Sequence, residues 1–298
     1  MYSLPTGVFP VLGCQIACRH RAGMFLLAMT MACVGAPAAH AQNSPNARLV
    51  RAVEENDLKA AQEALEQGAA PDATIDGNPV SCTAAYHGQT ALLKALLDHG
   101  ARLETRKFDD HLTLLMFAAL SGNPDTVQLL LDRKVRVNLQ DELGETALMT
   151  VREPPRPSLT SEETGPSKKR NPPQPSGLAA ILKLLLHAGA DKEMRDIDGR
   201  TALMRYANYG VQKGVEVLTD AGAKVNIRDR EGNTALILAA GWQQSETTFS
   251  SPADYLAVVQ NLLKRGSDPQ VKNRAGLTAL TAATRQDHKD IAALLKGN

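Results

Sequence analysis

The 298-residue sequence has few aromatic residues, little net charge and no apolar run as long as the ~20 residues that a membrane-spanning helix needs. Phe, Trp and Tyr make up 4% of the chain, with a single tryptophan, so each large aromatic residue at an exposed position is a candidate binding residue. The formal net charge of +1 lacks the basic excess typical of nucleic-acid-binding proteins. We therefore expect no nucleic-acid partner.

Acidic residues are absent from the first 41 residues. Arg19 and Arg21 precede an apolar run over residues 24–37, and an Ala-His-Ala sequence ends at residue 41. This order of basic, apolar and small residues is typical of a secretory signal peptide. The alternative is a membrane anchor, for which the apolar run is short. We predict a signal peptide over residues 1–41, cleavage before Gln42, export to the bacterial periplasm and no membrane insertion after cleavage.

Only one cysteine, Cys82, lies outside this leader, so we predict no intramolecular disulfide in the mature chain. Removing the leader leaves 31 basic and 32 acidic residues, a net charge of −1. This charge also predicts no binding to nucleic acid or to an anionic membrane. Cys82 is either an inert core thiol, which we favour, or a reactive one.

A repeated pattern is the strongest signal in the chain. Five threonines open the sequence Thr-x-Leu and are spaced by 33, 55, 33 and 44 residues: Thr113, Thr146, Thr201, Thr234 and Thr278. The spacing indicates one 33-residue period that is lengthened in two repeats. A fixed period of this size predicts stacked units, because a single unit cannot bury its apolar face alone.

The text of the repeat resembles the ankyrin repeat. Thr201-Ala202-Leu203-Met204 is followed by Tyr206-Ala207, by Gly210 and by Gly222-Ala223, similar to the family consensus that opens Thr-Pro-Leu-His-x-Ala. The resemblance covers residues 46–298 and implies an all-α fold, an α-solenoid of about seven stacked ankyrin repeats with short β-hairpin-like loops. We therefore assign residues 42–298 to one ankyrin-repeat domain.

Each unit also carries its own capping residues. The repeat threonine suits an N-cap, and the glycine that follows the second helix suits a left-handed C′ position. Lys134 stands where that glycine is expected, and His111 replaces the glycine of a turn. Apolar residues mostly occupy the slot of the consensus histidine, which predicts apolar packing between repeats in place of a polar bridge.

Two insertions interrupt the array. Residues 152–176, within repeat four, contain seven prolines, and residues 243–253 lengthen repeat six. Both fall at the turn between the two helices of a repeat. The composition of the longer insertion predicts a disordered or polyproline-like loop. It is either a tolerated surface insertion, which we favour, or a segment that docks a partner.

Motifs for catalysis are missing from the sequence. There is no Gly-x-Ser-x-Gly, no phosphate-binding Gly-x-x-x-x-Gly-Lys and no His-Glu-x-x-His. Asp141, Asp196 and Asp229 recur at one turn position, where a carboxylate can accept hydrogen bonds from local backbone N–H groups. We predict that the protein is not an enzyme, with no catalytic, cofactor-binding or metal-binding residues.

The resemblance implies a concave binding face, formed by the hairpin tips and by the exposed side of the first helix. We expect aromatic anchors on this face at Tyr86, Phe117, Tyr209 and Trp242. A mostly basic column lies six residues before the repeat threonines and includes Lys107, Arg195, Arg228 and Lys272. The alternatives are that Trp242 and Tyr209 pack under the shorter insertion or against each other, and that neighbouring turn aspartates compensate the basic column.

These observations predict a non-enzymatic module or scaffold of the bacterial periplasm. It acts as a monomer and binds an unidentified protein partner on its concave face. The alternative is an accessory protein that inhibits or protects a specific envelope enzyme. A fold alone does not name a ligand, so the partner's identity stays open.

Overall fold

The computed structural model describes residues 44–75, 77–104, 111–151, 177–243 and 250–297. These residues belong to one compact unit. Several predictions lie outside the described residues: the signal peptide over residues 1–41, the insertion over residues 152–176, most of the insertion over residues 243–253, and Lys107. They stay predictions.

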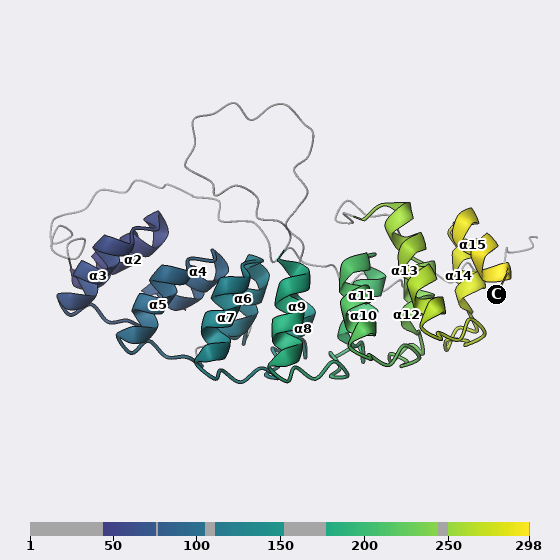
Figure 1. Ribbon diagram of the computed structural model, residues 1–298, viewed down its shortest axis with the longest axis horizontal. Helices are drawn as coiled ribbons and strands as arrows, with labels where there is room; N and C mark the ends of the chain where they lie inside the picture. Colours follow the sequence, from purple (N-terminus) through teal and green to yellow (C-terminus); the bar gives the residue numbers. More distant parts are fainter. Residues whose placement is uncertain (1–43, 76, 105–110, 152–176, 244–249, 298) are drawn as a thin grey trace, which may run out of the picture. The chain divides into compact units, whose positions relative to one another are not determined.

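Seven successive helix pairs make up the described chain, and this confirms the all-α solenoid (Figure 1). In each pair we call the first helix A and the second helix B. The pairs are α2 (Pro45–Glu55) and α3 (Leu58–Glu66), α4 (Val80–Tyr86) and α5 (Thr90–Asp98), α6 (Leu114–Ser121) and α7 (Pro124–Asp132), α8 (Ala147–Thr150) and α9 (Leu178–His187), α10 (Ala202–Asn208) and α11 (Gln212–Asp220), α12 (Ala235–Ala240) and α13 (Pro252–Lys264), and α14 (Ala279–Arg285) and α15 (Lys289–Lys296). One short hairpin precedes α4, where β1 (Thr74–Ile75) pairs antiparallel with β2 (Asn78–Pro79).

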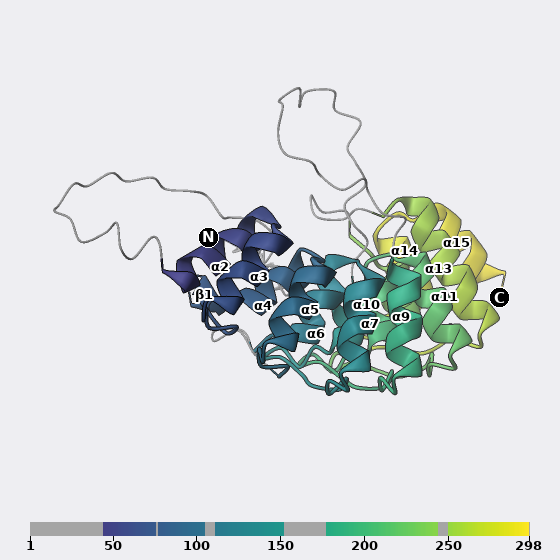
Figure 2. The same cartoon turned by 60° about the vertical axis from the view of Figure 1, so that its left-hand side comes forward.

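The helices stack in two rows. Helix A of one repeat packs on helix A of the next, as α4 does on α6 and α10 on α12. The B helices form a second row in which α5, α7, α9, α11 and α13 each pack on the next (Figure 2). Each repeat therefore buries its apolar face against its neighbours, as the period predicted. Within the described ranges, no helix is long and apolar enough to cross a membrane.

The repeat threonines cap the A helices. The hydroxyl oxygens of Thr113, Thr201, Thr234 and Thr278 accept hydrogen bonds from the backbone N–H three residues further on, at 3.3 to 3.4 Å. The N-cap prediction is confirmed at these four positions. Thr146 precedes the four-residue α8 and makes no side-chain cap bond, so the prediction is wrong there.

A left-handed residue ends most of the B helices. Five glycines at this position have φ between 76° and 95°: Gly68, Gly100, Gly189, Gly222 and Gly266. Lys134 takes the same conformation with φ 59°, and His111 has φ 51°. Both residues thus keep a backbone conformation that favours glycine, so repeat three carries local backbone strain at these two positions.

The slot of the consensus histidine is part of the core. Its residues are at most 5% exposed in five consecutive repeats: Cys82, Met116, Met149, Met204 and Ile237. The expected replacement of a polar bridge by apolar packing is confirmed in these repeats. Cys82 is 2% exposed, as expected for a core thiol.

The short helix A of repeat four is supported by a side chain of repeat five. Helix α8 has a single turn, so its last carbonyl groups lack the N–H partners that a longer helix would supply. The hydroxyl of Tyr206, on α10, lies 2.9 Å from the carbonyl oxygen of Leu148 and 3.1 Å from that of Val151. A side chain of repeat five thus satisfies the shortened helix of repeat four.

Candidate functional site

From residue 140 on, the loop that joins one repeat to the next ends in a tight turn, which is held by an aspartate in three cases and by Asn273 in the last. We call these turns the finger loops of repeats four to seven: residues 140–145, 195–200, 228–233 and 272–277. The carboxylate of Asp196 accepts hydrogen bonds from the backbone N–H groups of Asp198 and Arg200 at 3.0 and 2.8 Å. Asp141 and Asp229 bond their own turns in the same way, which confirms the structural role predicted for these aspartates.

Backbone hydrogen bonds hold the finger loops side by side. The N–H of Ile197 donates to the carbonyl oxygen of Leu143, and the N–H of Arg230 donates to that of Asp198. The N–H of Arg274 donates in the same way to the carbonyl oxygen of Glu231, and each of these three bonds is 2.9 Å long. The finger loops therefore follow one another along one edge of the helix array (Figure 1), and equivalent residues recur along that edge.

The basic column is built into this array. The guanidinium of Arg195 donates to the carbonyl oxygen of Arg228 at 3.0 Å, and Arg228 donates to that of Lys272. Gln140 begins the series with a bond of 2.9 Å to the carbonyl oxygen of Arg195. Arg195 and Arg228 thus link successive finger loops while staying exposed. The sequence shows their charge, but it does not show these long-range backbone partners.

The last finger loop differs in charge. Asn273 stands where the other described finger loops carry aspartate, and its side-chain oxygen accepts from the N–H of Leu277 at 2.9 Å. The turn bond is therefore kept without the negative charge. A cleft of about 300 Å³ lies between the last two finger loops, lined by Arg228, Asp229, Gly232, Asn273 and Arg274.

Two of the predicted aromatic anchors lie together on the A row. The rings of Tyr86, on α4, and Phe117, on α6, meet edge to face with centroids 6.5 Å apart. Tyr86 is 42% exposed, and Phe117 is partly buried. Such a pair combines rigid apolar area with a free hydroxyl edge, which suits a binding contact.

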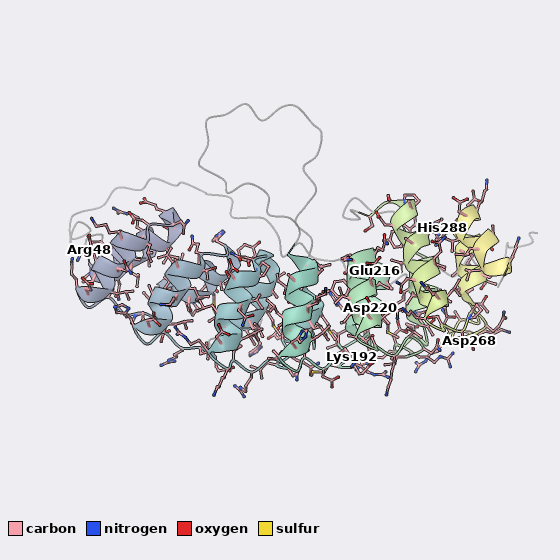
Figure 3. The ribbon with its side chains drawn as sticks, in the orientation of Figure 1. Arg48, Lys192, Glu216, Asp220, Asp268 and His288 are labelled. Carbon is pink, nitrogen blue, oxygen red and sulfur yellow. The ribbon has the colours of Figure 1, made fainter. Side chains whose placement is uncertain are left out.

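Trp242 is a core residue, so the prediction that it is exposed was wrong. It is 7% exposed, and its indole is stacked between the rings of Tyr255 and His288, at centroid distances of 4.4 and 4.6 Å. The two ring partners come from α13 and from the N-cap of α15, where Figure 3 labels His288. The alternative that Trp242 packs against other residues is therefore closer to the structure. Its ring partners are Tyr255 and His288 rather than Tyr209.

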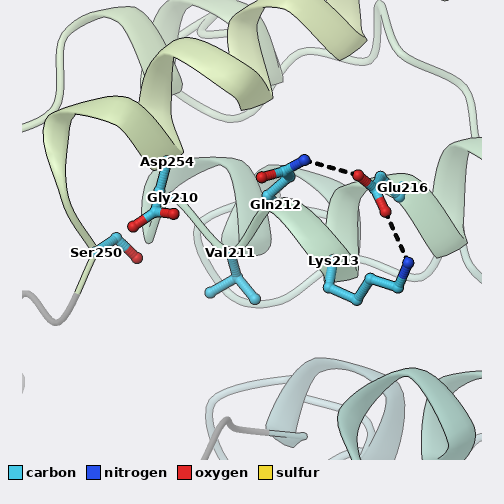
Figure 4. Close-up of a pocket in the computed structure, with 7 residues that line it drawn as sticks. All are labelled: Gly210, Val211, Gln212, Lys213, Glu216, Ser250 and Asp254. Carbon is cyan, nitrogen blue, oxygen red and sulfur yellow. Dashed lines mark hydrogen bonds and ion pairs between the residues drawn. The ribbon is translucent and has the colours of Figure 1, made fainter. Parts of the chain in front are cut away.

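Tyr209 is exposed, at 43%. Within the described ranges its ring makes no contact with the pair formed by Tyr86 and Phe117. Tyr209 is the C-cap of α10, and its carbonyl oxygen accepts a hydrogen bond of 2.6 Å from the hydroxyl of Ser250, within the shorter insertion. Beside it lies a polar cleft of about 300 Å³, which the sequence did not indicate (Figure 4). Its wall includes Gln212, Lys213 and Glu216, and Glu216 is bonded to both of the others.

A buried charge cluster ties the finger loops to the A row. Arg205 on α10 lies 2.8 Å from Glu145 and 3.1 Å from Asp196, and its side chain is 16% exposed. Burial opposes its charge, but Glu145, Tyr209 and Asp196 together outweigh burial and raise the pKa of Arg205. Sequence reasoning missed this cluster. The signal was an arginine at the helix-A slot that holds Phe117 and Leu238 in other repeats.

Groups for metal binding are not gathered in the described part of the chain, where no three His, Cys, Asp or Glu residues could hold one ion. The candidate features are therefore surfaces: the finger loops, the aromatic pair Tyr86 and Phe117 on the A row, and the polar cleft beside Tyr209.

Comparison with known proteins identifies the repeat. A family model described as "Ankyrin repeats (3 copies)" matches residues 49–141 and 175–248, more than half of the chain. A second model, "Ankyrin repeat", matches residues 231–274.

Three similar proteins come from Caenorhabditis elegans. Dauer abnormal formation protein 25 is 34% identical over 109 residues, which are 36% of this chain and 28% of that protein. E3 ubiquitin-protein ligase hecd-1 is 27% identical over 52% of this chain and 7% of its own length. A homologue of transient receptor potential cation channel subfamily A member 1 is 25% identical over 73% and 15%. The chain thus spans less than a third of the length of each of these relatives.

Proposed function

Because the chain belongs to the ankyrin-repeat family, whose members are generally non-enzymatic interaction modules, we propose that it binds a protein partner through the finger loops and the adjoining A row. This surface combines the backbone-linked finger loops of repeats four to seven with an aromatic pair on the A helices of repeats two and three. Both are held by rigid helices, so a partner meets a preformed surface, which lowers the entropy cost of binding.

The observation that carries the proposal is the Tyr86 and Phe117 pair. Tyr86 is one of four large hydrophobic residues that are exposed in the described part of the chain, with Leu143, Ile197 and Tyr209. Its ring contacts Phe117 and His87 but is not enclosed by the core. Exposed aromatic residues of this kind frequently dominate binding energy.

The proposed compartment is the bacterial periplasm, with the protein acting there as a monomeric scaffold. The support is the sequence of residues 1–41, which combines the absence of acidic residues, an apolar run and a small-residue cleavage pattern. The alternative within this proposal is an accessory protein that inhibits or protects one envelope enzyme.

A photo-crosslinking experiment tests the proposed surface. A photoreactive phenylalanine derivative replaces Tyr86 in the protein expressed in its source cells, and Lys183, on helix B, is replaced in the control variant. We expect crosslinked protein at residue 86 and not at residue 183. Crosslinking at residue 183 alone would place the partner on the B row and overturn the proposed surface. One enzyme captured in a one-to-one complex would favour the accessory role.

A further inference from the structure

The finger loops carry an uneven charge. The finger loops of repeats five to seven carry five exposed basic side chains but only two accessible acidic ones, Asp198 and Glu231. The basic residues are Arg195, Arg228, Arg230, Lys272 and Arg274. Asp196 and Asp229 are only 6% and 7% exposed, and their carboxylates are bonded to their own turns. They contribute little to what a partner contacts.

The excess is greatest at the last two finger loops. Arg230 and Arg274 occupy equivalent positions, since the N–H of Arg274 bonds the carbonyl oxygen of Glu231, the neighbour of Arg230. Among the described residues, no acidic side chain pairs with Arg230, Lys272 or Arg274. Asn273 removes the charge that an aspartate would supply. Of these three basic residues, Arg274 lines the cleft of about 300 Å³, where Arg228 is a second basic wall residue and Asp229 the acidic one.

Two apolar residues are exposed on the preceding finger loops: Ile197 stands at the position of Arg230, and Leu143 follows Glu142, which holds that position in repeat four. Leu143 and Ile197 are 39% and 42% exposed, and the backbone bond between them places them side by side. The exposed finger-loop residues of repeats four and five thus include two apolar side chains beside Glu142 and Arg195, whereas those of repeats six and seven are mainly basic. An electrostatic surface for nucleic acid would not need these apolar side chains, and the basic excess is small for that role.

We propose that the finger loops of repeats four to seven bind an acidic segment of the partner protein. Glutamate or aspartate side chains of the segment lie against Arg230, Lys272 and Arg274, with one carboxylate at the cleft. Apolar side chains of the segment contact Leu143 and Ile197. This inference rests on the proposed function and specifies the chemistry of the partner.

Fluorescence anisotropy with labelled peptides tests the proposal on the purified protein. The probe is a twelve-residue peptide with two leucines at one end and glutamates along the rest, made in both orientations. A second peptide carries lysine in place of glutamate. We expect the acidic peptide to bind in one orientation better than in the other, with an affinity that falls as salt rises. The lysine peptide should not bind.

Charge-removing variants locate the contact. We expect Arg230→Gln with Arg274→Gln to weaken binding of the acidic peptide by about tenfold, as two partly exposed ion pairs are removed. Lys183→Gln with Lys264→Gln removes the same charge from the B row and should leave binding unchanged. The pair Leu143→Ser and Ile197→Ser should abolish the preference between the two orientations.

Several outcomes would overturn this inference. They are equal binding of both peptides, equal losses in the two charge-removing variants, and tighter binding of a twenty-nucleotide DNA or RNA than of the acidic peptide. In each case, crosslinking at residue 86 would still support the proposed protein-binding function. Loss of that crosslink together with loss of peptide binding would remove both.

Discussion

Gly214 makes room for the ring of Tyr206. A Cβ atom at position 214, in the first turn of α11, would lie 2.7 Å from two atoms of that ring, closer than such contacts occur. The ring is 3% exposed, and its hydroxyl reaches the carbonyl groups of Leu148 and Val151. The glycine in helix B of repeat five therefore allows a tyrosine that supports the short helix A of repeat four.

This relationship predicts an unusual result for Gly214→Ala. Alanine is the better helix former by about 1 kcal/mol, but overpacking against Tyr206 costs about 1 to 3 kcal/mol. We expect a net loss in the free energy of unfolding, measured by urea denaturation. In a Tyr206→Ala background, the same change should stabilise the protein. Identical effects of Gly214→Ala in the two backgrounds would show that the pair does not interact.

The left-handed conformation of Lys134 predicts a stabilising substitution. A residue with a Cβ atom at φ 59° bears a cost of about 1 to 2 kcal/mol that glycine avoids. The greater freedom of glycine in the unfolded chain offsets part of this gain, so we expect Lys134→Gly to raise the free energy of unfolding by about 0.5 to 1 kcal/mol. The matched control, Gly222→Lys at the equivalent position, should lower it. A stability loss in Lys134→Gly would contradict this prediction.

Local features of the repeats were predictable from the sequence because their partners are near in the chain. The caps at Thr113 and Thr201 depend on the next three residues, and the turn at Asp196 depends on the next four. The burial of Trp242 was not predictable, since it depends on a ring in the next helix and another in the next repeat.

In the candidate surface, too, local features were predictable from the sequence and long-range contacts were not. Exposure of Tyr86 and Tyr209 agrees with their positions in the repeat. The bonds of Arg195 and Arg228 could not be read from the sequence, because the carbonyl groups that accept them belong to the next repeat. Charge alone suggested either a binding column or local compensation, and neither describes this linkage between finger loops.

Trp242 and Tyr86 should respond oppositely to truncation. Trp242→Ala removes a buried ring stacked on two others, so we expect a loss of about 3 to 5 kcal/mol in the free energy of unfolding. Tyr86→Ala changes an exposed residue and should alter stability by about 0.5 kcal/mol or less. Partner capture by the folded fraction should fall for Tyr86→Ala and not for Trp242→Ala. If partner capture fell for Trp242→Ala and not for Tyr86→Ala, Trp242 would be part of the binding surface.

Cleavage of the leader is a separate prediction. Residues 1–41 have the charge and apolar pattern of a signal peptide, so mature protein should begin at or near Gln42. Intact-mass measurement of protein from the cell envelope checks the new N-terminus. Replacing Ala39 and Ala41 by bulky residues should block cleavage and leave the longer chain. Full-length protein confined to the cytosol would contradict the proposed compartment.

Tyr255 provides a prediction for alkaline pH. Burial, followed by the nearby Tyr209 and Asp254, raises the pKa of Tyr255 to about 12, against about 10 for an exposed tyrosine. Its hydroxyl donates to the carbonyl oxygen of Asn208 at 3.2 Å, and its ring stacks on Trp242. The folded state therefore favours the neutral hydroxyl, and ionisation opposes folding.

The sign of the pH effect follows from the raised pKa. The contribution of the neutral hydroxyl is complete below pH of about 10 and is lost as the pH rises through about 12. Tyr255→Phe has no hydroxyl to ionise. We therefore expect the wild-type free energy of unfolding, measured by urea denaturation, to fall relative to that of Tyr255→Phe between about pH 9 and about pH 11. A difference that stays constant with pH would show that Tyr255 ionises equally easily in the folded and unfolded chains, and burial would then not hold its hydroxyl neutral.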